Sequence, residues 1–199
     1  MKWIIVGLGN PGGAYSSTRH NAGRIVVEYI RDSYGISEWV FDKKTESMRS
    51  KGLIENREFV AILPETFMNE SGRSLMSLIK SPADARNLIV VHDDIDLPLG
   101  TWKISFDRGS GGQKGVESIM TVLKTREFIR IRVGVLPRDE EGKVKKPKGE
   151  EAVVKFVLGK FREEEGVILE RVQREISDAL PMLVTQPLEL VMTKYNEKR

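Results

Sequence analysis

The sequence predicts an α/β fold formed by one domain over residues 1–199. β-rich runs alternate along the chain with segments whose apolar residues recur at helical spacing, as is typical of α/β proteins. Hydrophobic residues make up 40% of the chain, which suffices for one substantial core. We find no internal repeat or linker that would separate a second domain.

The first part of the chain predicts three strands and a helix. Residues 4–6 are β-rich and end in glycines, as expected for a first strand. Residues 21–34 carry apolar side chains at helical spacing, and Gly35 fits a C-terminal stop. Residues 48–55 and 58–63 predict two strands joined by a hairpin turn.

The middle of the chain predicts two helices and three strands. A helix is expected over residues 65–80, and the apolar run at residues 88–91 indicates a buried strand. Residues 101–106 predict the next strand. A glycine cluster then leads into a helix that ends near Lys124, and residues 128–135 predict a further strand.

The last part of the chain predicts helices. A short helix is expected at residues 152–158, and a long amphipathic helix at residues 163–180. Pro181 should end or kink the long helix, because proline lacks the backbone N–H and crowds the preceding turn. A final helix is expected at residues 189–198.

Charge and composition limit the classes of function. The net charge of +3 permits binding to a polyanion without requiring it. The absence of cysteine excludes disulfides and thiolate metal sites. No apolar run approaches the ~20 residues of a membrane helix, and the N-terminal run is too short for a signal peptide, so we expect a cytoplasmic protein without a membrane partner.

A run of lysines stands out near residue 145. Such a run is either a solvated surface loop or a mobile basic flap that contacts phosphates, and the sequence alone leaves both open. The run consists of Lys143, Lys145, Lys146 and Lys148.

Residues 7–12 fit the G-x-G-x-x-G pattern of dinucleotide-binding loops. That fingerprint needs a helix to begin within the motif, whereas the helical signal here begins only near Asn21. The acid expected about 20 residues further on would be Glu28, which falls inside a helix. We therefore expect no nucleotide cofactor, and a loop that presents the carboxamide of Asn10.

Two polar residues next to predicted helices are candidate catalytic groups. His20, one of two histidines, has an ordinary pKa near neutrality and is either a general base or a surface or capping histidine. Asn69 either caps its helix or points a carboxamide into a pocket.

Three acids follow the predicted strand at residues 88–91. Their pattern suits a magnesium site, a carboxylate that orients a histidine, or ordinary turn chemistry, and spacing alone does not choose among these. The acids are Asp93, Asp94 and Asp96.

In this order, the clusters resemble the bacterial-type peptidyl-tRNA hydrolase family. The ordered set is highly specific and spans nearly the whole chain, although each piece is weak. The matching segments are residues 5–12, Tyr15, 18–23, 66–69, 71–72, 92–94, 96–98, Gly100, 111–112, Gly115, 131–134 and 156–160.

The resemblance implies a single α/β domain of phosphorylase/hydrolase-like architecture, with a twisted mixed sheet sandwiched between helices. It also implies a monomeric, metal-free hydrolase that cuts the ester between peptide and tRNA and so recycles tRNA during translation. Its partners would be the peptide and the tRNA acceptor end, and no cofactor is expected.

The resemblance also implies roles for matching residues. His20 would activate water and Asp93 would hold and polarise its imidazole. Asn10 and Asn69 would grip the peptidyl end and support the developing oxyanion. The residues expected to line the cleft near the 3′ adenosine or the peptide are Tyr15, Phe67 and Met68.

The sequence departs from the family at residues 111–115, where Gln113 and Lys114 replace the usual His-Asn. The charge of Lys114 would lower the pKa of His20 if the two lie close, or would meet terminal phosphates of the tRNA. This departure motivates one alternative, a catalytically impaired RNA-binding relative. Basic residues available to contact the tRNA backbone are Lys103, Arg130 and Arg132.

Overall fold

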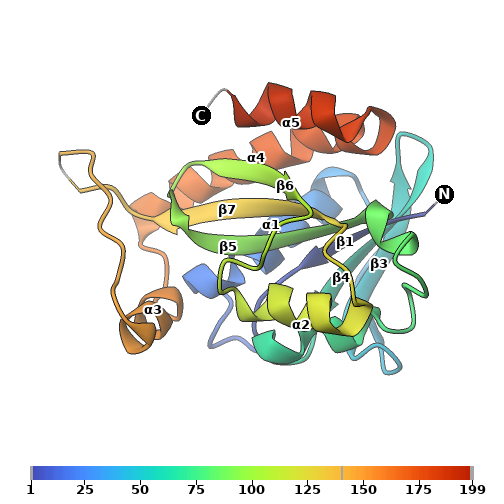
Figure 1. Ribbon diagram of the computed structural model, residues 1–199, viewed down its shortest axis with the longest axis horizontal. Coiled ribbons are helices and arrows are strands. Elements are labelled where there is room, and N and C mark those ends of the chain that lie inside the picture. The colour runs from blue at the N-terminus through green and yellow to red at the C-terminus, as the bar shows by residue number, and fades with distance from the viewer. Residues whose placement is uncertain (1, 140, 198–199) are drawn as a thin grey trace.

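In the computed structural model, which describes residues 2–139 and 141–197, seven strands form one mixed sheet in the order β2-β3-β4-β1-β5-β7-β6 (Figure 1). The central strands β4, β1, β5 and β7 run parallel, while β2, β3 and β6 pair antiparallel with their neighbours. The strands are β1 Trp3–Gly7, β2 Val40–Asp42, β3 Ser47–Ile54, β4 Arg57–Pro64, β5 Leu88–Pro98, β6 Trp102–Phe106 and β7 Ile129–Leu136.

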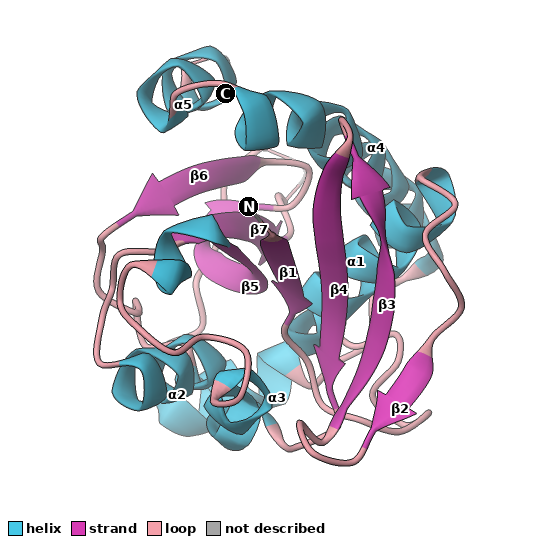
Figure 2. Ribbon diagram, turned by 90° about the vertical axis from the view of Figure 1, so that its right-hand side faces the viewer, coloured by secondary structure: helices cyan, strands magenta, loops and turns pink. Residues whose placement is uncertain are grey.

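Helices cover both faces of this sheet, as Figures 1 and 2 show. One face packs against α1, α4 and α5, and the other against α2 and η2. The helices are η1 Arg19–Asn21, α1 Ala22–Ser33, η2 Met68–Leu75, η3 Asp84–Asn87, α2 Lys114–Leu123, α3 Glu150–Val157, α4 Glu163–Thr185 and α5 Leu188–Asn196. The predicted α/β class, a mixed sheet between helices, is confirmed.

The central strands β1 and β5 each contain an apolar run, residues 3–6 and 88–91, whose side chains are buried on both faces of the sheet. Successive side chains of a strand point to opposite faces. Ile5 and Ile89 therefore join the core under α1 and α4, while Val6 and Val90 join the core under α2 and η2. This packing holds the carboxyl end of β1 beside Val91 of β5, two residues before Asp93.

The predicted helix at residues 65–80 is wrong in type and length. Only residues 68–75 are helical, and they form the 3₁₀ helix η2. Serine competes for local backbone groups: the Ser71 hydroxyl donates to the Met68 carbonyl at 2.8 Å. Gly72 lets η2 approach α2 closely, because a Cβ there would lie 2.5 Å from the Ser118 carbonyl oxygen.

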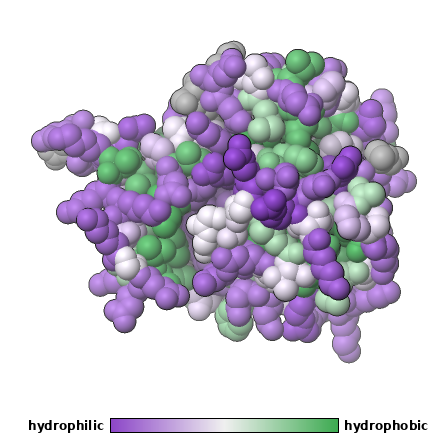
Figure 3. Space-filling model, viewed as in Figure 1, coloured by the Kyte–Doolittle hydropathy of each residue, from purple (hydrophilic) through white to green (hydrophobic). Residues whose placement is uncertain are grey.

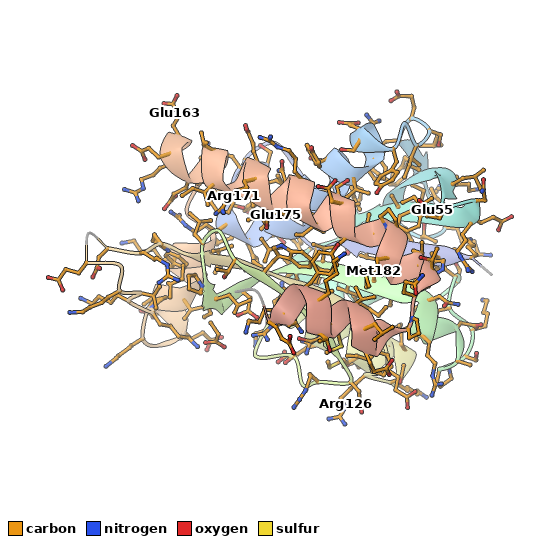
Figure 4. All side chains as sticks on the ribbon, turned by 90° about the horizontal axis from the view of Figure 1, so that it is seen from above. Glu55, Arg126, Glu163, Arg171, Glu175 and Met182 are labelled. Carbon is orange, nitrogen blue, oxygen red and sulfur yellow. The ribbon has the colours of Figure 1, made fainter. Side chains whose placement is uncertain are left out.

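Pro181 does not end the long helix, which runs on to Thr185; Figure 4 looks down on α4 from Glu163 to beyond Met182. A proline removes the N–H that would bond to the carbonyl four residues earlier. Here the carbonyl of Ser177 instead accepts a hydrogen bond from the Tyr34 hydroxyl at 2.8 Å. A tertiary contact thus satisfies the carbonyl that the proline leaves free.

Other differences concern element bounds. β2 lies in a stretch for which the sequence predicted no element. β5 extends to Pro98, so Asp93 and Asp94 lie within the strand instead of after it. The final helix ends at Asn196, and the predicted end at Lys198 lies outside the described residues. None of the described helices is both long and apolar enough to cross a membrane.

Candidate active site

The structure brings the two candidate catalytic side chains into direct contact. Nδ1 of His20, on η1, lies 2.9 Å from Oδ2 of Asp93, on β5. The side chains are 14% and 4% exposed, respectively. An ionised carboxylate only accepts hydrogen bonds, so Nδ1 carries the hydrogen and Nε2 is the ring nitrogen that can accept a proton. The orienting-carboxylate interpretation of Asp93 is the one that this geometry favours.

Burial and charge oppose each other at this pair. Burial disfavours the imidazolium of His20, but the charge of Asp93 and its hydrogen bond favour it more strongly, so the pKa of His20 is raised above its ordinary 6.5. Burial likewise opposes ionisation of Asp93, yet the charge of His20 and hydrogen bonds from His20 and Gln113 lower the pKa of this carboxyl. Asp93 is therefore a carboxylate near neutral pH.

A second hydrogen bond reaches Asp93 from the glycine-rich loop. Nε2 of Gln113 donates to Oδ1 of Asp93 at 2.9 Å and lies 3.3 Å from the sulfur of Met68. Gly115 permits this packing, because a Cβ there would lie 2.5 Å from the same sulfur. The sequence marked Gln113 only as a departure from the family. Its partners lie 20 and 45 residues away in the chain, so no local signal could have identified its contacts.

Asn10 is held by its backbone and by one side-chain atom. Its N–H donates to Asn21 Oδ1, and its carbonyl accepts from Asn21 Nδ2, both at 2.9 Å. Its Oδ1 accepts the backbone N–H of Met68 at 2.9 Å. Within the described part of the chain, Nδ2 of Asn10 has no partner, so it can donate to a ligand. Asn21, which the sequence did not single out as a site residue, orients this group.

The other predicted cleft residues are less constrained. Asn69 follows Met68 on η2 and its side chain is exposed, and Phe67 is 60% exposed beside it. Tyr15 is half-buried in the loop before η1, where its carbonyl accepts the Thr18 hydroxyl at 2.8 Å. Sequence proximity places Phe67 and Asn69 next to Met68, which is 5% exposed and contacts Gln113.

The three acids of the cluster turn to different partners. Asp93 contacts His20, Asp94 Oδ2 accepts Nε of Arg132 at 2.6 Å, and Asp96 forms an ion pair with Lys146. Across the described residues, no three His, Asp or Glu side chains converge as metal ligands would. The arrangement therefore favours the His–Asp interpretation over the magnesium site.

A group of basic side chains lies on β6 and β7 at the edge of the site. Lys103 and Arg132 are cross-strand partners, and Arg130 lies two residues before Arg132, on the same face of β7. Together they line a cavity next to Asp94 and the glycine-rich loop. Arg130 is only 4% exposed, and no hydrogen bond or ion pair to its guanidinium occurs among the described residues.

Lys114 is exposed at the start of α2, and its ammonium lies 4.0 Å from Glu117. The pKa of His20 is determined by its burial and by the nearby Asp93 carboxylate. Lys114 therefore does not act on His20 in the way that the sequence allowed.

Arg19 anchors the segment that carries His20. Its guanidinium donates to Glu165 at 2.6 Å and to the Lys160 carbonyl at 2.8 Å, and it lies 4.9 Å from the centre of the Phe156 ring. The Arg19 N–H also donates to the Gly159 carbonyl at 3.0 Å. The start of α4 thereby fixes η1, a role that the sequence gave no means to infer across 146 residues.

The arrangement suits acyl transfer to water. It provides a buried His–Asp pair with one ring nitrogen free of Asp93, a carboxamide donor, and a basic surface beside them. A positioned general base contributes about 10²–10⁴-fold to such a reaction.

The chain is similar to known proteins over almost its entire length. A sequence model of the family described as peptidyl-tRNA hydrolase matches residues 4–199. Peptidyl-tRNA hydrolase of Syntrophotalea carbinolica is 35% identical, with 98% of this chain and 97% of that protein covered. Peptidyl-tRNA hydrolase of Dehalococcoides mccartyi is 37% identical, with 97% and 98% covered.

Comparison with solved structures indicates the same family. The crystal structure of peptidyl-tRNA hydrolase from Acinetobacter baumannii superposes with a TM-score of 0.86 at 31% sequence identity, and 98% of this chain and 94% of that chain are covered.

Proposed function

We propose a mechanism from the premise that this chain belongs to the peptidyl-tRNA hydrolase family. Its reaction is the hydrolysis of the ester bond that joins a peptide to tRNA. We assign His20 as the general base and Asp93 as the carboxylate that orients it. The observation that carries this assignment is the 2.9 Å contact between His20 Nδ1 and Asp93 Oδ2.

In the first step, Nε2 of His20 accepts a proton from water while the water oxygen bonds to the ester carbonyl carbon. Asp93 stabilises the imidazolium that forms, as its charge already does in the free protein. In the second step, the bond from the carbonyl carbon to the ribose oxygen breaks, and the proton on Nε2 passes to that oxygen. The products are a peptide with a free carboxyl group and a tRNA with a free ribose hydroxyl.

Asn10 and Asn69 are the proposed partners of the peptidyl group. The free Nδ2 of Asn10 supports a role as donor to the peptide backbone or to the developing oxyanion, where one donor typically contributes about 3 kcal/mol. The exposed carboxamide of Asn69 can reach a ligand without losing an existing hydrogen bond. Carboxamides that bind peptide backbone accept any side chain, which suits an enzyme that processes every nascent peptide.

The cleft walls are proposed to receive the 3′ adenosine or the peptide. Phe67 offers an exposed aromatic ring for stacking, which contributes about 1–3 kcal/mol per base. Tyr15, in the loop before η1, and Met68, on η2, are proposed to form the remaining walls.

The tRNA backbone is proposed to lie over the basic face. Lys103 and Arg132 are supported by their shared position on β6 and β7, and Arg130 by its unpaired, buried guanidinium. Exposed Lys114 adds a donor at the start of α2. Phosphates would supply an anionic partner for Arg130 and a further one for Arg132, which already pairs with Asp94.

We further propose that the chain acts as a cytoplasmic monomer without a metal or cofactor, because its substrate arises in translation and an activated ester needs only a base. The alternative, a catalytically impaired RNA-binding relative, gains no support. Every residue of the proposed catalytic set is retained, and the curated relatives are named peptidyl-tRNA hydrolases.

Single-turnover release of peptide from N-blocked aminoacyl-tRNA tests this mechanism. We expect cleavage by the wild type with a strong chelator present, and loss of about 10²–10⁴-fold in rate for His20→Ala. His92→Ala is unsuitable as a control, because His92 is buried beside Asp93. Gln186→Ala, at the exposed end of α4, replaces it. Cleavage by His20→Ala at the wild-type rate would refute the base assignment, and loss of wild-type rate in chelator would refute the metal-free mechanism.

A further inference from the structure

At the start of α2, the Gln113 side chain accepts one hydrogen bond and donates another. Its Oε1 accepts the N–H of Val116 at 2.9 Å, and so caps the helix. Its Nε2 donates to Oδ1 of Asp93, also at 2.9 Å. One side chain thus joins the N-terminus of α2 to the carboxylate that contacts His20.

The two partners fix which end of the amide points where. A backbone N–H can only donate and an ionised carboxylate can only accept, so Oε1 must face Val116 and Nε2 must face Asp93. The Gln113 carboxamide satisfies both, because it has a donor and an acceptor on one group. Glutamate would keep the acceptor and lose the donor, and methionine would lose both at similar length.

The second bond restricts Asp93. Its Oδ2 is engaged by His20 and its Oδ1 by Gln113, so the carboxylate cannot rotate without breaking a hydrogen bond. Rotation would swing the His20 ring and move Nε2 away from the water that it must deprotonate. Hydrogen bonds to charged groups are also stronger than those between neutral groups.

The charged groups around this contact are few. Asp93 faces His20 from η1 and its own strand neighbour His92, which is wholly buried and whose pKa is lowered chiefly by that burial. Lys114 projects from α2 toward Glu117, and Asp94 is paired with Arg132. Gln113 does not titrate, so its bond to Asp93 persists at every pH at which Asp93 is ionised.

We propose that Gln113 is a positioning residue of this enzyme, whose carboxamide holds the Asp93 carboxylate between the N-terminus of α2 and His20 and thereby aims His20 at water. The inference rests on the proposed roles of His20 and Asp93. It gives a function to a position at which the sequence departs from its family, where glutamine donates to Asp93.

The test measures kcat/KM against pH, together with the NMR titration of the two histidines, for Gln113→Met and Gln113→Glu. For Gln113→Met we expect kcat/KM to fall about tenfold at pH 7, the equivalent of one hydrogen bond to a charged group. The acid limb of the profile and the His20 titration should both move to higher pH. The reason is that a carboxylate without its second donor holds the imidazolium more strongly.

Gln113→Glu separates capping from positioning. It keeps an acceptor for the Val116 N–H, so the helix cap survives, but it places a second carboxyl beside Asp93. We expect the acid limb to move to higher pH again, because the added negative charge also favours the imidazolium. This variant decides the question if Gln113→Met fails to fold. The matched control is Gln186→Met, at the exposed end of α4, which should keep the wild-type profile.

Two outcomes would overturn the inference, and both differ from failure of the proposed function. If the Gln113 variants lose only thermal stability while the pH profile and the His20 titration stay unchanged, Gln113 is a helix cap alone. If both variants match the wild type in every readout, Gln113 has no role. If instead His20→Ala keeps the wild-type rate in the same assay, the proposed function itself fails.

Discussion

Two regions of this molecule are held in opposite ways. The proposed catalytic network, defined as Asn10, His20, Met68, Asp93 and Gln113, is largely buried and joined by hydrogen bonds near 2.9 Å. The basic loop, defined as residues 142–148, projects from the body on the part of the surface where hydrophilic side chains predominate (Figure 3), and four of its residues are lysines. Its lysine side chains form exposed ion pairs, such as that of Lys143 with Glu141, and its backbone bonds to the neighbouring Arg138 and Asp139.

This difference shows which part of the molecule depends on precise geometry. A general base works only when it is held at hydrogen-bond distance from the proton it takes, so the network is built from matched donors and acceptors. A phosphate backbone can be attracted by mobile charges, and exposed ion pairs contribute only about 0–1 kcal/mol each. Changes in the network should therefore affect the chemical step, and changes in the loop only binding.

The largest effect is expected from Asp93→Asn. The new carboxamide can donate to Nδ1 of His20, which forces the proton onto Nε2 and leaves no ring nitrogen free to accept one from water. We expect single-turnover cleavage to fall about 10²–10⁴-fold with little change in tRNA affinity. A rate within tenfold of the wild type would show that Asp93 does not set the tautomer of His20.

A large effect on stability is expected from Arg19→Met. This change removes the arginine that pairs with Glu165, a carboxylate that is 3% exposed. Removing one partner of a buried ion pair typically costs about 3–5 kcal/mol, and we expect the lower end of this range because Glu165 keeps hydrogen bonds from the backbone N–H and the guanidinium of Arg162. Urea unfolding at pH 7 measures the loss. Arg31→Met is the matched control: Arg31 also faces carboxylates and an aromatic ring, but its partners are exposed, so we expect under about 1 kcal/mol.

The pH dependence of this loss has a definite sign. Burial opposes ionisation of Glu165, but hydrogen bonds from Arg162 and Arg19 outweigh it and lower its pKa below the ordinary 4.5. A carboxyl with a lowered pKa stabilises the fold above its unfolded-state pKa and loses that contribution as the pH falls through the folded value. The difference between Arg19→Met and the wild type should shrink below pH 4.5. A difference that stays constant there would mean that packing on Phe156, and not charge, carries the effect.

The same contrast explains how much the sequence could predict. Elements whose patterns are local were found, such as β1, α1 and the β3–β4 hairpin, where Glu55 and Asn56 adopt the positive φ that their turn requires. The predictions were wrong where a tertiary contact determines the local structure. For example, the Ser177 carbonyl accepts a hydrogen bond from the Tyr34 hydroxyl, and α4 continues beyond Pro181.

In the site, the ordered motifs and the resemblance that they carry predicted Asn10, His20 and Asp93, and the structure brings His20 and Asp93 into contact. It could not show that Gln113 contacts Asp93, because a glutamine in a glycine-rich loop gives no hint of which distant group it meets. Nor could it show that Arg19, next to the proposed base, is tied to a glutamate 146 residues away. Such contacts depend on how the sheet brings the loops together.

The smallest effect is expected from replacing the loop lysines together by glutamine. KM for peptidyl-tRNA should rise about three- to tenfold, since each exposed charge contributes under about 1 kcal/mol. The dependence of binding on salt should become shallower, because fewer counterions are released from the tRNA. The rate of the chemical step and the melting temperature should stay unchanged, as these side chains are exposed and far from any core contact. The four lysines are Lys143, Lys145, Lys146 and Lys148.

A charge-matched variant on the opposite part of the sheet distinguishes a specific loop contact from a general loss of positive charge. It replaces four other exposed lysines by glutamine: Lys43, Lys44, Lys51 and Lys80. If both variants weaken tRNA binding equally, only net charge matters and the loop has no contact of its own. If the loop variant alone slows cleavage at saturating substrate, the contrast between the two regions breaks down. The ion pair of Lys146 with Asp96, three residues beyond Asp93, would then be the connection to examine, by replacing Lys146 alone.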